Sequence, residues 1–188
     1  GGWWLGGMQA GSVPWTAPMP PNPFAVNVHA LRRHPGDRTS EQRHGRLPGL
    51  QVTGSHVPDD AEVSIDAVLE GVNGGVVVTA TVDTTWVGEC RRCLEAAHGV
   101  VHGEMRELYE QDSDGEETYP LAGDQLDLAP LARDAVLLEL PLAPLCTEDC
   151  QGLCPECGAN RNEGDCGHAS VPTDPRWAAL DALRTHES

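Results

Sequence analysis

The segment of residues 61–86, "AEVSIDAVLEGVNGGVVVTATVDTTW", decides the fold, because its hydrophobic residues recur at every second position. The spacing from Val63 to Leu69 places apolar side chains on one face of a pleated strand, and the run from Val76 to Val82 alternates in the same way. Between the two runs, Asn73-Gly74-Gly75 is typical of a tight hairpin turn. The segment therefore predicts a β-hairpin.

The segments on either side extend this hairpin into an antiparallel sheet. "LQVTGSHV" (residues 50–57) is a candidate third strand. "HGVVHGEMRELYE" (residues 98–110) fits one face of a strand or of a helix, and Gly99 and Gly103 favour the strand because glycine weakens helices.

Two helices are predicted after the sheet. Residues 127–141, "DLAPLARDAVLLELP", carry Pro130 in the first turn and end at Pro141. Residues 173–185, "TDPRWAALDALRT", begin with Asp174 as a capping residue. We expect an α+β fold with an antiparallel β-sheet core, two short helices and a C-terminal zinc-knuckle module.

The zinc module is predicted from five of the seven cysteines, which lie in "CTEDCQGLCPECGANRNEGDC". Cys154-Pro-Glu-Cys157-Gly has the spacing that lets two thiolates reach one zinc ion. The spacing does not identify the other two ligands. His168 is a reserve candidate for one of them. The predicted metal ligands are four of Cys146, Cys150, Cys154, Cys157 and Cys166, with Cys154 and Cys157 included.

A second pair, Cys90-Arg-Arg-Cys93, leaves three interpretations open. It is a turn between strands, a donor to zinc, or a redox dithiol. The redox interpretation is disfavoured because thioredoxin-type pairs open a helix in a βαβ unit, and this pair follows an antiparallel hairpin.

The charge counts against a stand-alone, high-affinity binder of RNA or DNA. The chain has 188 residues, 12 basic and 29 acidic, for a formal charge of −17, and this charge repels phosphate. The acids also crowd the knuckle, where Arg161 is the nearest cation. The Arg-rich stretch from Arg32 to Arg46 is the one candidate for direct phosphate contact, or else a solvated flexible segment.

The sequence predicts three parts: a flexible N-terminal extension (1–46), a domain of sheet and helix (47–145), and a cysteine-rich zinc module with a C-terminal helix (146–188). Clustered cysteines and the absence of a signal peptide favour a reducing, cytoplasmic compartment. No motif of the common hydrolases, nucleotide-binding proteins or metalloproteases occurs. Four protein ligands would close the zinc site, so we expect no enzyme activity.

The order of several motifs resembles the YceD family, the large ribosomal RNA subunit accumulation proteins, in the branch that carries the cysteine knuckle. The motifs are "CRRCLE", "ELY", "LDLAPLARDAVLLELPLAPLC", "CQGLCPECGANRNEGDC" and "DPRWAALDAL", within about residues 45–185. The chain has Cys166-Gly-His168 where that branch often has Cys-x-Cys. The resemblance implies a cytoplasmic bacterial protein needed for accumulation of 23S rRNA.

Three hypotheses about function follow. The first is a non-enzymatic, zinc-binding factor for large-subunit biogenesis, which contacts assembly precursors or a basic ribosomal protein, since opposite potentials steer association. The second is a thiol redox or metal-responsive protein that uses Cys90 and Cys93. The third is a stand-alone zinc-ribbon nucleic-acid binder, which the acidic surroundings of the knuckle disfavour. No membrane and no small-molecule substrate are expected.

Overall fold

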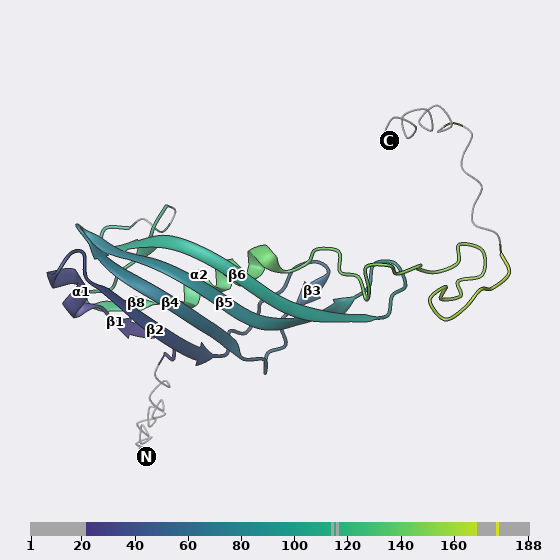
Figure 1. Ribbon diagram of the computed structural model, residues 1–188, viewed down its shortest axis with the longest axis horizontal. Helices are drawn as coiled ribbons and strands as arrows, with labels where there is room; N and C mark the ends of the chain where they lie inside the picture. Colours follow the sequence, from purple (N-terminus) through teal and green to yellow (C-terminus); the bar gives the residue numbers. More distant parts are fainter. Residues whose placement is uncertain (1–21, 114, 116, 169–175, 177–188) are drawn as a thin grey trace, which may run out of the picture.

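A long, twisted β-sheet forms the body of the molecule in the computed structural model, which describes residues 22–113, 115, 117–168 and 176 (Figure 1). The six-stranded sheet has the order β2-β4-β5-β6-β7, and β3 also pairs with β5. A separate two-stranded sheet joins β1 to β8. The elements are β1 Ala25–Asn27, α1 His29–Arg33, β2 Arg38–Gly45, β3 Ser55–His56, β4 Val63–Val72, β5 Gly75–Glu89, β6 Ala96–Glu110, β7 Tyr119–Pro120, β8 Gln125–Asp127 and α2 Ala129–Glu139.

The predicted hairpin is confirmed. β4 and β5 pair antiparallel from Ser64↔Asp83 to Val72↔Gly75, around a turn at Asn73 and Gly74. The ambiguous segment after it is a strand, since β6 pairs with β5 from Gly75↔Glu110 to Glu89↔Ala96. One pair departs from the antiparallel expectation, because the short β7 runs parallel to β6.

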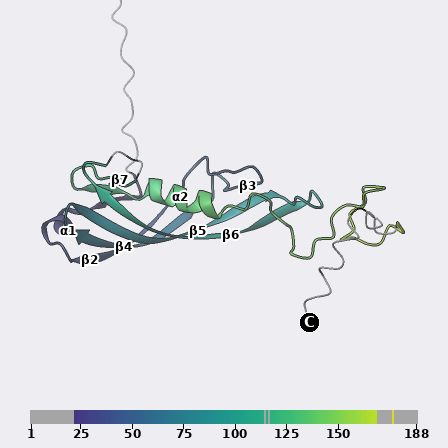
Figure 2. The same ribbon diagram turned by 90° about the horizontal axis from the view of Figure 1, so that it is seen from above.

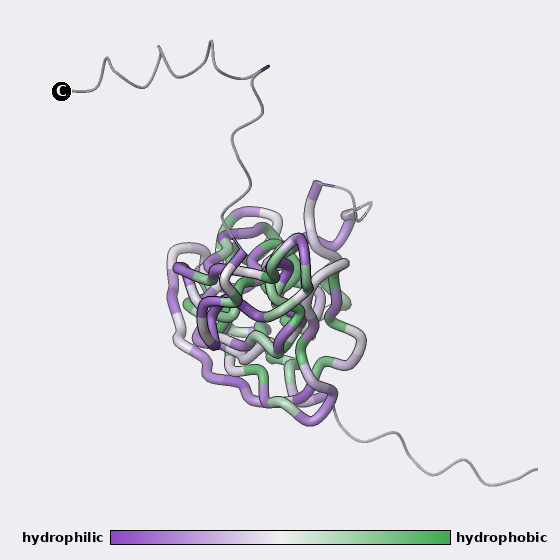
Figure 3. The backbone as a smooth tube through the Cα atoms, turned by 90° about the vertical axis from the view of Figure 1, so that its right-hand side faces the viewer, coloured by the Kyte–Doolittle hydropathy of each residue, from purple (hydrophilic) through white to green (hydrophobic). Residues whose placement is uncertain are grey.

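One face of the sheet holds the core. The alternating residues of β4 and β5, from Val63 to Leu69 and from Val76 to Val82, are buried there. Leu131, Ala135 and Val136 of α2 are buried too, and α2 packs along β6 and β5 on one side of the sheet (Figure 2). Along the chain, hydrophobic and hydrophilic residues alternate, as the changing colours of the tube show (Figure 3).

The other face of the sheet, which we call the open face, is solvent-exposed. It carries the residues that alternate with the core residues, among them Asp66, Val68, Thr79, Val100 and Glu104, and these are exposed. Val100 is 77% exposed although it is large and apolar. Among the described residues, no helix packs on this face.

Residues 22–46 belong to this fold, which corrects the expected flexible extension for the part that the structure describes. β2 pairs with β4 along its whole length, and Phe24, Val26 and Leu31 are buried in the core. The sequence signal was weak because β2, "RTSEQRHG", is polar on both faces and is held by backbone hydrogen bonds to β4. Residues 1–21 lie outside the described part.

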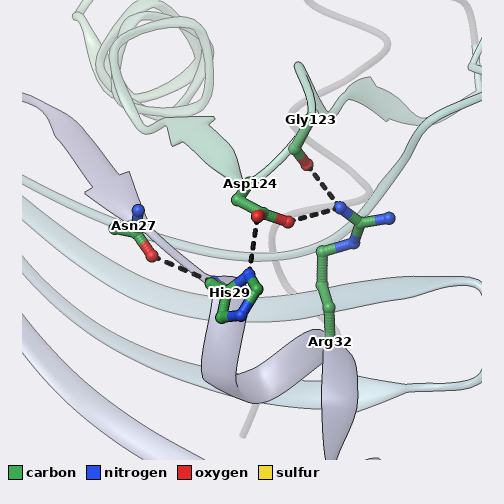
Figure 4. Close-up of polar contacts among 5 residues, drawn as sticks. All are labelled: Asn27, His29, Arg32, Gly123 and Asp124. Atoms are coloured by element: carbon green, nitrogen blue, oxygen red, sulfur yellow. Dashed lines mark hydrogen bonds and ion pairs between the residues drawn. The ribbon is translucent and has the colours of Figure 1, made fainter.

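α1 is a short helix that the sequence analysis missed, and a polar cluster attaches it to the turn before β8 (Figure 4). Arg32 Nη1 donates a hydrogen bond to Asp124 Oδ1 at 2.6 Å, and Asp124 Oδ2 lies 2.7 Å from His29 Nδ1. Arg32 also donates to the Gly123 carbonyl oxygen at 2.8 Å. The hydrogen bond with His29, followed by that with Arg32, lowers the pKa of Asp124.

α2 confirms the first predicted helix, with a proline in its first turn. The second predicted helix, residues 173–185, lies outside the described residues except for Arg176. Of the helices that the structure describes, none combines the length and the apolar character needed to span a bilayer. The segment after α2 runs to the tip of the β5–β6 hairpin and continues beyond it (Figure 1).

Candidate metal centres

The cysteines form two groups at the end of the molecule, each with four ligand atoms that lie within 4.8 Å of one another. We call these groups the inner site and the outer site. The inner site comprises Cys90, Cys93, Cys146 and Cys150, and the outer site comprises Cys154, Cys157, Cys166 and His168.

The inner site joins two distant parts of the chain. Cys90 and Cys93 lie in the turn between β5 and β6, and the segment after α2 brings Cys146 and Cys150 to them. Hydrogen bonds guide that segment: Ser55 Oγ donates to the Pro141 carbonyl at 2.8 Å, and Arg91 N donates to the Pro144 carbonyl at 3.0 Å.

Arg92 completes the junction between the hairpin tip and the C-terminal segment. Its Nη1 donates to the Cys150 carbonyl oxygen at 3.0 Å, and its own carbonyl oxygen accepts from Leu153 N at 3.1 Å. Gly152 lies against the same carbonyl, where an added Cβ would be 3.0 Å from the oxygen. The close approach, together with a φ of +70°, explains why glycine occupies position 152.

The distances between ligand atoms fit a tetrahedral ion. Zinc–sulfur bonds of about 2.3 Å place two tetrahedral ligands about 3.7 Å apart. In the inner site, the sulfurs of Cys90 and Cys150 are 3.7 Å apart, and those of Cys93 and Cys146 are 3.5 Å apart. In the outer site, Cys154 Sγ lies 3.7 Å from His168 Nδ1. All seven cysteines are free thiols, so disulfides do not account for the clusters.

The two Cys-x-x-Cys turns share one backbone geometry. Leu94 N donates to the Cys90 carbonyl at 2.9 Å, and Gly158 N donates to the Cys154 carbonyl at 2.8 Å. In the first turn, Cys90 N donates to the Glu95 carbonyl oxygen at 2.8 Å. In the second turn, Cys154 N donates to the Ala159 carbonyl oxygen at the same distance. The turn at Cys90 therefore has the same backbone geometry as the predicted knuckle at Cys154.

The backbone of Leu94 is strained in this geometry. Its φ is +66°, a left-handed value that is unfavourable for a residue with a Cβ, whereas the equivalent residue of the second turn is Gly158, with a φ of +74°. Leu94 is the one non-glycine residue with positive φ among the described residues. Strain of this kind persists where the surrounding structure imposes it, which is common at functional sites. It is independent support for a constrained site at Cys90 and Cys93.

Leu94→Gly is expected to stabilise the metal-loaded protein relative to Leu94→Ala by about 1 kcal/mol, since alanine keeps the Cβ that strains this conformation. Both variants remove a side chain that is 58% exposed, so the packing loss is similar and small. Urea denaturation at fixed free zinc measures the difference. Equal stabilities would show that position 94 carries no strain.

The inner thiols influence one another because four ionisable groups share a small volume. Burial opposes ionisation of Cys90, but backbone N–H groups of Cys93, Arg92 and Cys146 together lower the pKa of its thiol to about 6. At Cys93, the backbone N–H of Glu95 favours the thiolate, yet burial and the neighbouring thiols raise the pKa to about 12. Four thiolates therefore need a cation to coexist here.

The outer site differs from the inner site in exposure and donor type. Cys154 is buried, and backbone N–H groups of Cys157 and then Glu156 lower the pKa of its thiol to about 6. Cys157 and His168 are exposed. His168 Nδ1 lies 3.7 Å from the Cys154 sulfur, and its Nε2 lies 3.7 Å from the Glu156 carboxylate, which is an ion-pair distance.

The five ligands predicted from the sequence belong to two sites in the structure and not to one. A single site was expected to draw on residues 146–166, but Cys146 and Cys150 lie with Cys90 and Cys93. Cys154, Cys157 and Cys166 lie together, and His168 joins them. A count of donors was the available signal: seven cysteines and one nearby histidine supply eight ligands, enough for two tetrahedral ions.

The arginines proposed to contact phosphate are mostly paired with acids. Arg32 contacts Asp124, Arg38 contacts Glu70 at 3.0 Å, and Arg43 contacts Glu41 at 2.8 Å. Within the described residues, this leaves Arg33 and Arg46 of that stretch without an ion pair. The local charge therefore offers little attraction for a polyanion.

Comparison with known proteins finds one matching family model and several related proteins. The sequence model of "Large ribosomal RNA subunit accumulation protein YceD" matches residues 78–184. The chain is 34% identical to an uncharacterized protein of Mycobacterium bovis over 177 residues, which cover 89% of this chain and 84% of the relative. It is 33% identical to a protein of Mycobacterium leprae over 173 residues, 85% of this chain and 76% of the relative.

A plant relative carries a descriptive name. The chain is 32% identical to the chloroplastic "Large ribosomal RNA subunit accumulation protein YCED homolog 1" of Arabidopsis thaliana over 66 residues, 35% of this chain and 21% of the relative. No solved structure gives a significant match.

Proposed function

This chain belongs to the YceD family, and we propose that it is a non-enzymatic, metal-binding factor that supports 23S rRNA accumulation and large-subunit biogenesis in the cytoplasm. The observation that carries the metal-binding part is the assembly of two sites with four donors each, each site containing one Cys-x-x-Cys turn. Four protein ligands leave no open position for substrate, which favours structural ions, with zinc the ion that such thiolate-rich sites prefer.

The partner is proposed to be a basic protein of the assembling large subunit, and the open face is the proposed contact surface. Its exposed carboxylates are Asp66, Asp83, Glu89 and Glu104. Of the arginines on this face, Arg38 is paired with Glu70, which leaves Arg106. His102 lies between two of the carboxylates, 2.7 Å from Asp83 and 3.8 Å from Glu104. An acidic surface with apolar residues such as Val100 fits a basic polypeptide better than RNA.

A redox function for Cys90 and Cys93 is the weaker alternative. Both side chains are almost fully buried, at 0% and 3% exposed, so an oxidant or a partner disulfide cannot reach them without opening the site. The same two thiols already have two further sulfurs as neighbours. A stand-alone nucleic-acid binder is weaker still, because the outer loop carries Glu163 and Asp165.

Affinity capture of the tagged protein from a lysate, with and without RNase, tests the proposal. We expect large-subunit ribosomal proteins, identified by mass spectrometry, to remain bound after RNase. We also expect cells that lack the protein to hold less 23S relative to 16S rRNA. Loss of every ribosomal protein after RNase would contradict the protein contact, and an unchanged rRNA ratio would contradict the biogenesis role.

Charge reversal locates the contact. Asp66→Arg with Glu104→Arg is expected to weaken capture about tenfold or more, because two unit charges about 4 Å apart interact by about 1–4 kcal/mol and reversal replaces that attraction with repulsion. Asp59→Arg with Asp60→Arg makes the same charge change in an exposed loop away from the open face. Equal weakening by both pairs would show that only net charge matters.

A further inference from the structure

Asn162 connects the two candidate metal sites. It lies in the loop between Cys157 and Cys166, which are both outer-site residues. Its Nδ2 nevertheless lies 3.3 Å from Sγ of Cys150, which belongs to the inner site. Its Oδ1 accepts the backbone N–H of Gln151 at 2.7 Å, next to Cys150 in the chain.

Further hydrogen bonds hold the outer loop in this position. Asn160 Oδ1 accepts from the backbone N and from Nδ2 of Asn162, at 3.0 and 2.8 Å. Arg161 N donates to the Gly152 carbonyl at 2.9 Å, and Leu153 pairs with Asn160 as an isolated bridge. The loop therefore lies against residues 151–153, the short link between the two sites.

We propose that Asn162 is a positioning residue that couples the two metal sites; the inference rests on the metal binding proposed above. The outer site fixes both ends of the loop, and the loop presents the Asn162 amide to the Cys150 sulfur. An N–H donor stabilises a metal-bound thiolate by reducing its charge. An ion in the outer site therefore raises the affinity of the inner site for its own ion.

The size and symmetry of the effect follow from general principles. Loss of a hydrogen bond to a metal ligand typically costs about 10- to 100-fold in metal affinity. Linkage requires that the inner ion strengthen the outer site by the same factor by which the outer ion strengthens the inner one. The two sites should consequently fill together, although they share no ligand.

Asn162→Asp removes the amide donor to the Cys150 sulfur, together with its hydrogen bond to Asn160 Oδ1. Aspartate has the same shape and keeps the acceptor for Gln151 N, but it replaces the amide donor with a carboxylate oxygen beside the Cys150 sulfur. Asn73→Asp, in the exposed β4–β5 turn, makes the same chemical change far from both sites. Cys157→Ser disables the outer site without removing an inner ligand.

The experiment is a zinc titration against a competing chelator on the full chain. The proteins are the wild type, Asn162→Asp, Cys157→Ser, the double variant and the Asn73→Asp control. The amide resonance of Ala97, buried within the inner cluster, reports the inner site, and that of Gly158 reports the outer site. Co²⁺ spectra separate four-thiolate coordination from coordination by three thiolates and one imidazole.

We expect Asn162→Asp and Cys157→Ser each to weaken the inner site about 10- to 100-fold. The inner site of the double variant should bind zinc about as weakly as that of Asn162→Asp alone, because the same contact carries both effects. Asn73→Asp should match the wild type.

Two results would overturn the coupling while leaving metal binding intact. One is an inner-site affinity that does not change in Cys157→Ser. The other is fully additive losses in the double variant. A wild type that binds no zinc at either site would instead refute the metal-binding proposal itself, and the coupling with it.

Discussion

Chelation of metal, or Cys93→Ser, is expected to release residues 145–168 from the tip of the β5–β6 hairpin while the sheet stays folded. Outside the inner site, the junction depends on a few hydrogen bonds made by the backbone of Arg91 and by Arg92. Each such bond contributes about 0.5–1.5 kcal/mol net. A structural zinc ion contributes about 10–16 kcal/mol of apparent binding free energy in zinc-finger peptides, so its loss decides the outcome.

Hydrogen exchange measured by mass spectrometry follows the release. Exchange should rise across residues 145–168 and stay slow in β4, β5 and α2, whose core side chains lie elsewhere. Cys157→Ser, measured at a free zinc concentration that still fills the weakened inner site, is the matched control, because it removes an outer ligand and should raise exchange only from about residue 154 onward. Cooperative unfolding of the sheet on chelation would contradict this division of the molecule.

Phe24→Ala is expected to destabilise the sheet domain by about 3–5 kcal/mol, the usual cost of removing a buried aromatic side chain. Phe24 is 2% exposed, and its ring lies against Gly45 of β2, where an added Cβ would be 2.7 Å from Cζ. Its carbonyl oxygen accepts the N–H of Leu128 at 3.1 Å. Phe24 therefore connects the start of the described chain to the segment that leads into α2.

Urea denaturation followed by circular dichroism measures this loss. Val68→Ala on the open face is the control, because Val68 is 44% exposed and surface substitutions usually change stability by about 0.5 kcal/mol or less. If Phe24→Ala cost no more than Val68→Ala, the segment before β2 would be an appendage, as the sequence alone suggested.

If the two sites are coupled, the junction is a single metal-dependent unit. Arg92 binds the segment at Cys150 and Leu153, and Asn162 then binds that segment to the outer loop. Loss of either ion would loosen the other site before the sheet is affected. The end of the molecule would then respond to metal supply, while the open face keeps its shape.

The sequence alone determined the features that depend on neighbouring residues. Alternation from Val63 to Val82 specifies the hairpin, since successive strand side chains point to opposite faces. Pro130 and the apolar stripe after it specify α2. The Cys154–Gly158 knuckle is a local turn, so its spacing is sufficient to recognise it.

Only the tertiary structure decided which cysteines meet. Cys90 and Cys150 are 60 positions apart, and they come together because the segment after α2 is led to the hairpin tip through Ser55 and Arg91. In sequence, Cys150 is much nearer to Cys154, which belongs to the other site. Spacing along the chain therefore identifies a pair of ligands, but the path of the chain between pairs is set by long-range packing and backbone hydrogen bonds, and these determine which pairs share an ion.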